Sequence, residues 1–530
     1  MNNIFDKQIQ PAKWFTALAL SFIIFLTLYV YSFSFKGGFI WDDYALIYNN
    51  RYIQSFSHLK EIFTTPWGAG SGVESSFYRP FTIFTFMFDY KLWGLHASGY
   101  HLGNTLMHIA ASLLVFWIVR ILAGGIWQAF AAALLFAVFP GNVQAVCYLS
   151  NRAEIFSTIF SVLSLGFYIL FYEKEKPVYF VSTALFVLLG FLTKESIFAF
   201  FAIALCYHFC FQRKMKLVPS LVLPALAVIY LCLRMSIFHN QMFPFAVIPH
   251  GNLLGRLMLF SCAFFGYLKI ILWPFDLHAE YMDYPFTWYD PRVIAGLVLF
   301  VAIIAVVFFV SKKHKTIAFG LSWFVIGLMP YSGLYPLAFY KADHYMYFPV
   351  IGLFMVFGIL LAAFYRKQKR FAFFILVAAA LFYSFLSIKQ NSYWVDAVKF
   401  YRRTLHYSPY SKRIRTMLGR EYINRGQFVF AAETFKDLIR LYPDSFAGYY
   451  ELGFDYAIAG QKEAAVVELD KALRFHDGEF ASYLNTGDLL LSWGYCAQAK
   501  DAFREALRVR PGDATAQLKL LSIEHSNCLK

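Results

Sequence analysis

Two adjacent carboxylates, Asp42 and Asp43, follow the first long apolar run of the chain. They lie in the segment FIWDDY, directly after Gly37-Gly38, and two glycines allow a sharp turn where a chain leaves a membrane. Charge is costly to hold there, and partial desolvation raises a carboxylate's pKa toward that of a useful general base. The pair could bind a metal, take a proton from a substrate or mark a solvated loop. We favour the proton acceptor.

Basic side chains recur near the ends of later apolar runs, on what we expect to be the same side of the membrane as the two carboxylates. They are Arg79, Arg152, Lys194 and His344. Cations beside a base suit the departure of a phosphate leaving group, because they neutralise the charge that develops on it. Arg152 and Lys194 are our first choices, with Glu154 and Glu195 as groups that orient them. The simpler alternative is that these charges only neutralise their neighbours at the interface.

Three further polar side chains, His101, Asn104 and His108, share one face of an expected helix, since they are three and four residues apart. Two histidines seven residues apart give no local chelate, so hydrogen bonding inside a bundle is favoured over metal binding. His101 is kept as a supporting residue, with Asp343 and Tyr345. The predicted chemistry requires no metal or other cofactor, although a cation at Asp42 stays an open alternative.

The composition is that of a membrane protein. Of 530 residues, 59% are hydrophobic and 21% aromatic, which excludes an ordinary soluble domain. The formal net charge of +15 comes from basic residues in short loops between apolar runs, so it indicates membrane topology and not nucleic-acid binding.

Eleven apolar stretches are expected to cross the membrane as helices, the shorter ones tilted or buried in a bundle. They are 14–34, 101–121, 126–140, 153–172, 178–193, 196–211, 217–237, 292–311, 316–332, 348–365 and 371–388. Another stretch, 253–273, is expected to be re-entrant or interfacial, because only then do all basic loops share the cytoplasmic face. Most acidic residues of the first 390 positions, including Glu280 and Asp283, then lie outside the cytoplasm or at its boundary.

The last third of the chain repeats with a period of 34 residues. Three columns are in register: Gly419, Gly453 and Gly487; Gly426, Gly460 and Gly494; Ala431, Ala465 and Ala499. This is the tetratricopeptide pattern, in which each repeat is a helix-turn-helix. We therefore expect an all-α protein with two domains, a membrane bundle over 1–390 and an extracytoplasmic α-solenoid over 391–530 whose concave face holds a peptide.

A series of motifs in fixed order gives the chain a family resemblance. The series is IWDDYALIYNN, YRPFTIFTF, YHLGNTLMHIAASLL, FAVFPGNVQAVCYLSNRAEI, LTKES, YLKIILWPFDLHAEY and DHYMYFPVIG, followed by the repeats. It resembles the transmembrane and tetratricopeptide repeat family of protein O-mannosyltransferases, which belongs to the GT-C class of membrane glycosyltransferases. The chain departs from the family's pattern at Phe139, Gln144 and Asp343-His344.

The resemblance implies an inverting transfer of a sugar, mannose or another hexose, from a polyprenyl-phosphate carrier to Ser or Thr hydroxyls of an extracytoplasmic protein. By that match Asp42 is the general base and Asp43 helps to position the acceptor. The expected location is a bacterial inner membrane, with site and repeats on the periplasmic side.

Three alternatives stay open. The chain could transfer a sugar or oligosaccharide to a glycan or lipid, it could be a membrane-anchored scaffold without enzymatic activity, or, less readily, it could be a transporter.

Overall fold

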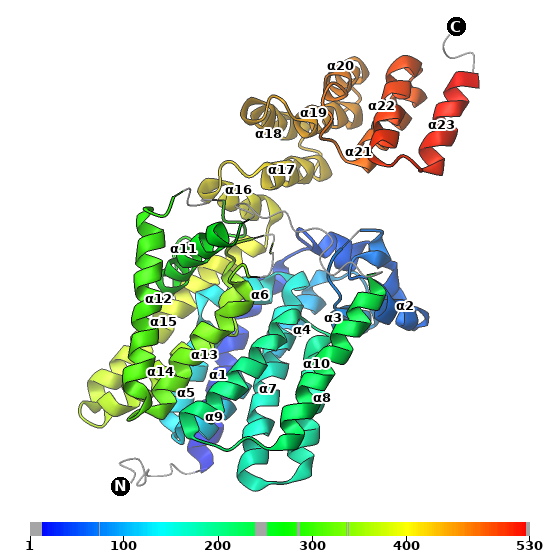
Figure 1. The fold of residues 1–530 in the computed structure, drawn as a ribbon. Helices are drawn as coiled ribbons and strands as arrows, with labels where there is room; N and C mark the ends of the chain where they lie inside the picture. The colour runs from blue at the N-terminus through cyan, green and yellow to red at the C-terminus, as the bar shows by residue number, and fades with distance from the viewer. Residues whose placement is uncertain are drawn as a thin grey trace. The chain divides into compact units, whose positions relative to one another are not determined.

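The structure is a computed structural model that describes residues 13–73, 75–238, 252–282, 287–334, 337 and 339–525. The described residues form helices and no strand, as expected for an all-α protein (Figure 1). The chain divides into two compact units, Met1–Asp396 and Ala397–Lys530. Asp283 lies outside the described residues.

Seven described helices of the first unit are long and apolar enough to cross a membrane. They are α1 (Lys13–Tyr31), α4 (Ala97–Ala123), α7 (Arg152–Lys174), α10 (Leu217–Ile237), α11 (Leu253–Leu272), α12 (Pro291–Ser311) and α15 (Lys369–Trp394). Six of them coincide with predicted spans. A chain with this set of helices is an integral membrane protein.

The remaining predicted spans are helical but shorter. They fall on α5 (Ile126–Val138), α8 (Pro177–Phe191), α9 (Ala199–Phe211), α13 (Lys315–Leu328) and α14 (Val350–Tyr365). Even a helix of 16 residues rises only about 24 Å, less than the hydrocarbon thickness of a bilayer. α5 is one arm of a pair bent by 52°, continuing into Pro140–Cys147, so it and that segment can form one broken span. Six of the eleven predicted spans thus have the length to cross a bilayer, and the crossing of the five shorter ones, expected to be tilted or buried in the bundle, stays a prediction.

The stretch 253–273 forms α11, which packs against α12. Its 20 residues meet the length and composition needed to span a bilayer. The expectation that it is re-entrant therefore rests on the distribution of basic loops alone, and it stays a prediction.

Small residues let the helices of the first unit pack closely. A Cβ at Gly358 in α14 would lie 2.5 Å from the backbone oxygen of Gln128 in α5, and one at Gly352 would lie 2.2 Å from that of Gly320 in α13. Contacts this short require glycine. The close packing of α5, α13 and α14 explains how these shorter helices are buried among longer ones.

Three further described α-helices of the first unit lie near the candidate residues. α2 (Leu59–Thr64) and α3 (Pro80–Trp93) follow the turn with the two carboxylates. α6 (Val143–Cys147) follows the break after α5 and leads, through a 3-10 turn, into α7. Pro140 starts that break because proline cannot continue the hydrogen bonding of α5.

The second unit consists of α16 (Ala397–Tyr407), three helix pairs and α23 (Ala514–His525). The pairs are α17 (Lys412–Asn424) with α18 (Phe428–Leu441), α19 (Phe446–Ile458) with α20 (Lys462–Ala472), and α21 (Phe480–Ser492) with α22 (Cys496–Val509). The turns within the pairs contain Gly426, Gly460 and Gly494, whose φ values are +69°, +78° and +83°. The period of 34 residues thus gives the expected helix pairs, while peptide binding by a concave surface stays a prediction.

Candidate active site

The turn after α1 presents the two carboxylates in different environments. Asp43 is 1% exposed, and its Oδ1 accepts hydrogen bonds from the backbone N and Oγ of Ser150 at 2.8 and 2.5 Å. Its Oδ2 accepts from the backbone N of Ile40 at 3.1 Å. Burial raises the pKa of Asp43 to about 7, and the hydrogen bonds from Ser150 and Ile40 oppose that rise. Asp43 therefore fixes the shape of the turn.

Asp42 is more exposed than its neighbour and so is the better placed of the two to meet a substrate. Its Oδ2 accepts a hydrogen bond from the hydroxyl of Tyr148 at 2.5 Å. Tyr148 is the residue directly after α6, and it lies 106 positions after Asp42 in the chain. The residue that follows the short helix α6 therefore contacts the predicted general base.

Lys194 and Glu154 form an ion pair with side chains 9% and 1% exposed. The second carboxylate oxygen of Glu154 accepts a hydrogen bond from the Tyr331 hydroxyl at 2.9 Å. Tyr331 stacks on Tyr345 at a ring-centroid distance of 4.0 Å, and Lys194 Nζ lies 5.4 and 5.7 Å from the two ring centroids. Glu154 thus orients Lys194, the arrangement expected for a supporting carboxylate.

Glu195 is shared by two arginines. Arg79 Nη2 lies 3.4 Å from Oε2 of Glu195, and Arg234 Nη1 lies 2.5 Å from Oε1. Arg234, at the end of α10, was absent from the residues predicted. Arg79 also lies over the ring of Phe77, 4.2 Å from its centroid. Its buried Nε has no hydrogen-bond partner within the described part of the chain.

Arg152, the other first choice for the phosphate, is fully buried and committed to other side chains. Its guanidinium pairs with Asp89 of α3, and its Nε donates to Asn104 Oδ1 of α4 at 2.7 Å. The same group lies 4.4 Å from the centroid of the Phe86 ring. These contacts hold α3, α4 and α7 together, and a donor phosphate would have to displace Asp89 to reach the arginine. The geometry favours a structural role for Arg152.

His344 lies beside Gln144 of α6. Its backbone N and its Nδ1 each lie 3.0 Å from Oε1 of Gln144. Burial lowers the pKa of His344 well below its usual value, and the charges of Lys194 and Arg79 lower it further. The neutral imidazole, with its proton on Nδ1, is a weaker phosphate partner than the cation predicted from the sequence.

The supporting residues predicted from the sequence are distributed around this region. Tyr345 belongs to the stack over Lys194, while Asp343 Oδ1 accepts a hydrogen bond from the Tyr281 hydroxyl at 2.5 Å. His101 lies against the turn, since a Cβ at Gly37 would be 3.0 Å from its Nε2. Glu280 is 3% exposed.

The hydrogen bonds expected for the other two polar residues of α4 are present. Asn104 Nδ2 donates to the backbone oxygen of Val146 at 3.1 Å, and His108 contacts the Tyr347 hydroxyl and the backbone oxygen of Ala137 at 2.6 and 3.0 Å.

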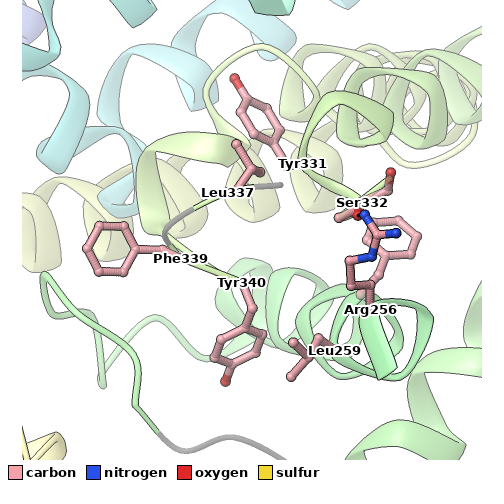
Figure 2. A pocket seen from close by; sticks show the side chains of 9 residues that line it. Arg256, Leu259, Tyr331, Ser332, Leu337, Phe339 and Tyr340 are labelled. Carbon is pink, nitrogen blue, oxygen red and sulfur yellow. Dashed lines mark hydrogen bonds between the residues drawn. The ribbon is translucent and has the colours of Figure 1, made fainter. Parts of the chain in front are cut away.

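A small cavity adjoins Tyr331 (Figure 2). Arg256 and Leu259 of α11 line one side of it, and Tyr340 and Phe339 come from the loop after α13. Tyr331 therefore connects this mostly apolar cavity to the ion pair of Lys194 and Glu154. Among the described residues, no three His, Cys, Asp or Glu side chains gather as metal ligands.

The sequence did not single out Tyr148, Tyr331, Arg234 and Asp89, and it marked Gln144 only as a departure from the family's pattern. Their spacing in the sequence gives no sign of a role, because each contacts a residue far away in the chain. The signal available was the position of Gln144 and Tyr148 in one motif with Arg152.

The chain is similar to known protein mannosyltransferases. Residues 80–238, from α3 to the end of α10, match the family described as dolichyl-phosphate-mannose-protein mannosyltransferase. A Caenorhabditis elegans protein, Protein O-mannosyl-transferase F38B6.6, is 26% identical over 445 residues, covering 80% of this chain and 63% of its own. The mouse proteins TMTC4 and TMTC3 are each 23% identical, covering 76% and 89% of this chain and 63% and 58% of their own.

The chain is a relative of these protein O-mannosyltransferases. The resemblance predicted from its motifs is thereby confirmed. The chain spans less than two thirds of the length of these three relatives.

Proposed function

We propose that this protein is an inverting membrane glycosyltransferase that moves a sugar from a polyprenyl-phosphate carrier to a hydroxyl of a protein. The named relatives favour mannose as the sugar and Ser or Thr as the acceptor. The proposed location is a bacterial inner membrane, with the site and the helix pairs of the second unit on the extracytoplasmic side. Those helix pairs are proposed to hold the acceptor segment.

The observation that carries the proposal is that α6 and the residue after it contact both Asp42 and His344. Gln144, near the beginning of α6, contacts His344. Tyr148, directly after the end of α6, contacts Asp42. Lys194, Arg79 and Arg234 together with Glu154 and Glu195 give three positive and two negative charges. The cluster carries one net positive charge, which suits a reaction in which an anionic lipid phosphate departs.

The proposed reaction is a single displacement at the anomeric carbon. Asp42 takes the proton from the acceptor hydroxyl while that oxygen forms a bond to the anomeric carbon. The bond between this carbon and the phosphate oxygen breaks, and the lipid phosphate leaves with the electron pair. A phosphate departs as an anion without protonation, so one base suffices, unlike the carboxylate pair of glycoside hydrolysis. Lys194 and Arg79 are the proposed phosphate contacts.

The test is transfer of radiolabelled sugar from polyprenyl-phosphate donors to cell-envelope protein. The purified wild type is compared with Asp42→Asn, which keeps the shape of the side chain but removes the base. We expect label on protein with the wild type and a loss of about 100-fold or more in kcat with the variant. A wild type that transfers no sugar, together with an Asp42→Asn variant that still rescues a deletion strain, would favour the scaffold.

A further inference from the structure

The segment between α6 and α7 holds both carboxylates of the turn after α1. Tyr148 donates its hydroxyl to Asp42 Oδ2, and two residues later Ser150 donates its backbone N and its Oγ to Asp43 Oδ1. The two acidic residues are thus oriented from one side, by donors on a single short stretch of chain.

The ring of Tyr148 stacks against two tryptophan rings. The Trp41 ring stacks on it with a centroid distance of 5.4 Å and an interplanar angle of 16°, and the Trp394 ring stacks on it at 5.7 Å and 25°. All three side chains are buried, at 6%, 7% and 3% exposure for Tyr148, Trp41 and Trp394. A phenol enclosed in this way has little freedom to turn its hydroxyl away from Asp42.

Trp41 occupies a backbone conformation that is rare for a bulky residue. Its φ is +62°, in the left-handed region that bulky residues rarely adopt and that costs on the order of 1 kcal/mol or more. The residue directly before Asp42 is therefore held in a strained conformation while its ring stacks on Tyr148. Strain of this kind persists only where the surroundings determine the conformation, and it is concentrated at functional sites.

From these contacts we infer that Tyr148 is a positioning residue for the base of the transfer reaction, with Trp41 and Trp394 holding it in place. A hydrogen bond donated to the charged carboxylate favours that charged form and fixes which way it points. Asp42 can then receive the acceptor proton without a prior rotation of its side chain. The inference rests on the proposed function, since it assigns Asp42 the role of base.

The variant that tests this is Tyr148→Phe, which keeps the ring and its stacking and removes only the hydroxyl. We expect kcat to fall about tenfold or more with little change in the donor KM. We also expect the acidic limb of the profile of kcat/KM against pH to move to higher pH, because Asp42 loses a donor that favours its charged form. A purely structural role would not move that limb.

The matched control is Tyr383→Phe, which removes another tyrosine hydroxyl hydrogen bond, to the backbone oxygen of Ile271 at 2.6 Å, from α15. It should leave kcat and the pH profile close to those of the wild type. A Tyr148→Phe variant with the kcat and acidic limb of the wild type would overturn the inference while leaving the proposed function standing. Failure of the wild type to transfer sugar would instead count against the proposed function.

Discussion

At the scale of single residues, the site depends on how buried charges are paired. Lys194 and Glu154 neutralise each other where neither side chain has access to much water. Removing one member of a buried pair leaves an uncompensated charge and typically costs about 3–5 kcal/mol, whereas replacing both with neutral groups costs far less. Variants of this pair can therefore separate a structural role of Lys194 from a role in sugar transfer.

Lys194→Met should strongly destabilise the protein, because Glu154 loses its counter-charge. The double variant Lys194→Met with Glu154→Gln should recover most of the lost stability but not the sugar transfer, since no cation is restored for the phosphate. Thermal unfolding in detergent and transfer kinetics measure the two effects. Wild-type transfer by the double variant would assign Lys194 to structure alone.

Asp43 makes stability depend on pH. Its pKa in the folded protein is about 7, above the value of 3.8 for an unperturbed carboxyl group, so the folded state binds the proton more tightly. The contribution of this proton to the free energy of unfolding is full below the unperturbed pKa and is lost as the pH rises through the pKa of the folded protein.

We expect the apparent melting temperature of the wild type to fall between about pH 4 and about pH 7, and that of Asp43→Asn to fall less over the same range. The slope with pH is the readout, because the substitution also changes the hydrogen bonds with Ser150. Equal slopes for the two proteins would show that Asp43 does not titrate in this window.

At the scale of elements, the helix pairs of the second unit depend on glycine for two different reasons. A Cβ at Gly453 in α19 would lie 2.8 Å from Cγ of Leu469 in α20, so glycine permits their close approach. Gly460 has open space around it but a φ of +78°, so it permits the turn between the same two helices. Substituting alanine at these two glycines should therefore lower the free energy of unfolding by different amounts.

Gly460→Ala should destabilise the protein by about 1 kcal/mol from backbone strain. Gly453→Ala should cost more, typically 1–3 kcal/mol, because the added methyl overpacks the interface. Gly512→Ala is the control, since it has neither a positive φ nor a neighbour within 4 Å. Unfolding midpoints followed by circular dichroism measure all three. A Gly453→Ala variant as stable as this control would contradict the packing argument.

At the scale of the whole molecule, the proposed function requires the turn with Asp42 and the helix pairs to lie on the same side of the membrane. The distribution of basic loops gives this arrangement if 253–273 does not cross. The length of α11 is compatible with crossing, so an experiment on topology decides between the two.

Reporter fusions after Lys315 and after Asn391 provide that experiment. We expect a cytoplasmic signal from the first and an extracytoplasmic signal from the second, as the positive-inside rule requires. A cytoplasmic signal at Asn391 would overturn both the topology and the proposed side of the helix pairs.

The helices and the repeats were predictable from the sequence because their signals are local. Apolar runs fixed where the helices lie, and the glycines spaced by 34 residues fixed the turns within the pairs. The lengths of the shorter helices were less predictable, since an apolar run does not show where the backbone bends. Pro140 marked one such bend, but the angle between its two arms depends on the helices packed around it.

The sequence by itself determined which residue types could do chemistry, because two carboxylates after Gly37-Gly38 and basic residues near the ends of apolar runs are visible in one dimension. Only the tertiary structure decided their roles. Arg152 and Lys194 have similar local settings, and each pairs with a carboxylate. The guanidinium of Arg152 is enclosed by Asp89, Asn104 and Phe86, whereas the ammonium of Lys194 lies near Tyr331, which lines a cavity. Partners like these come from elements many tens of residues away, and their choice depends on packing that no local pattern encodes.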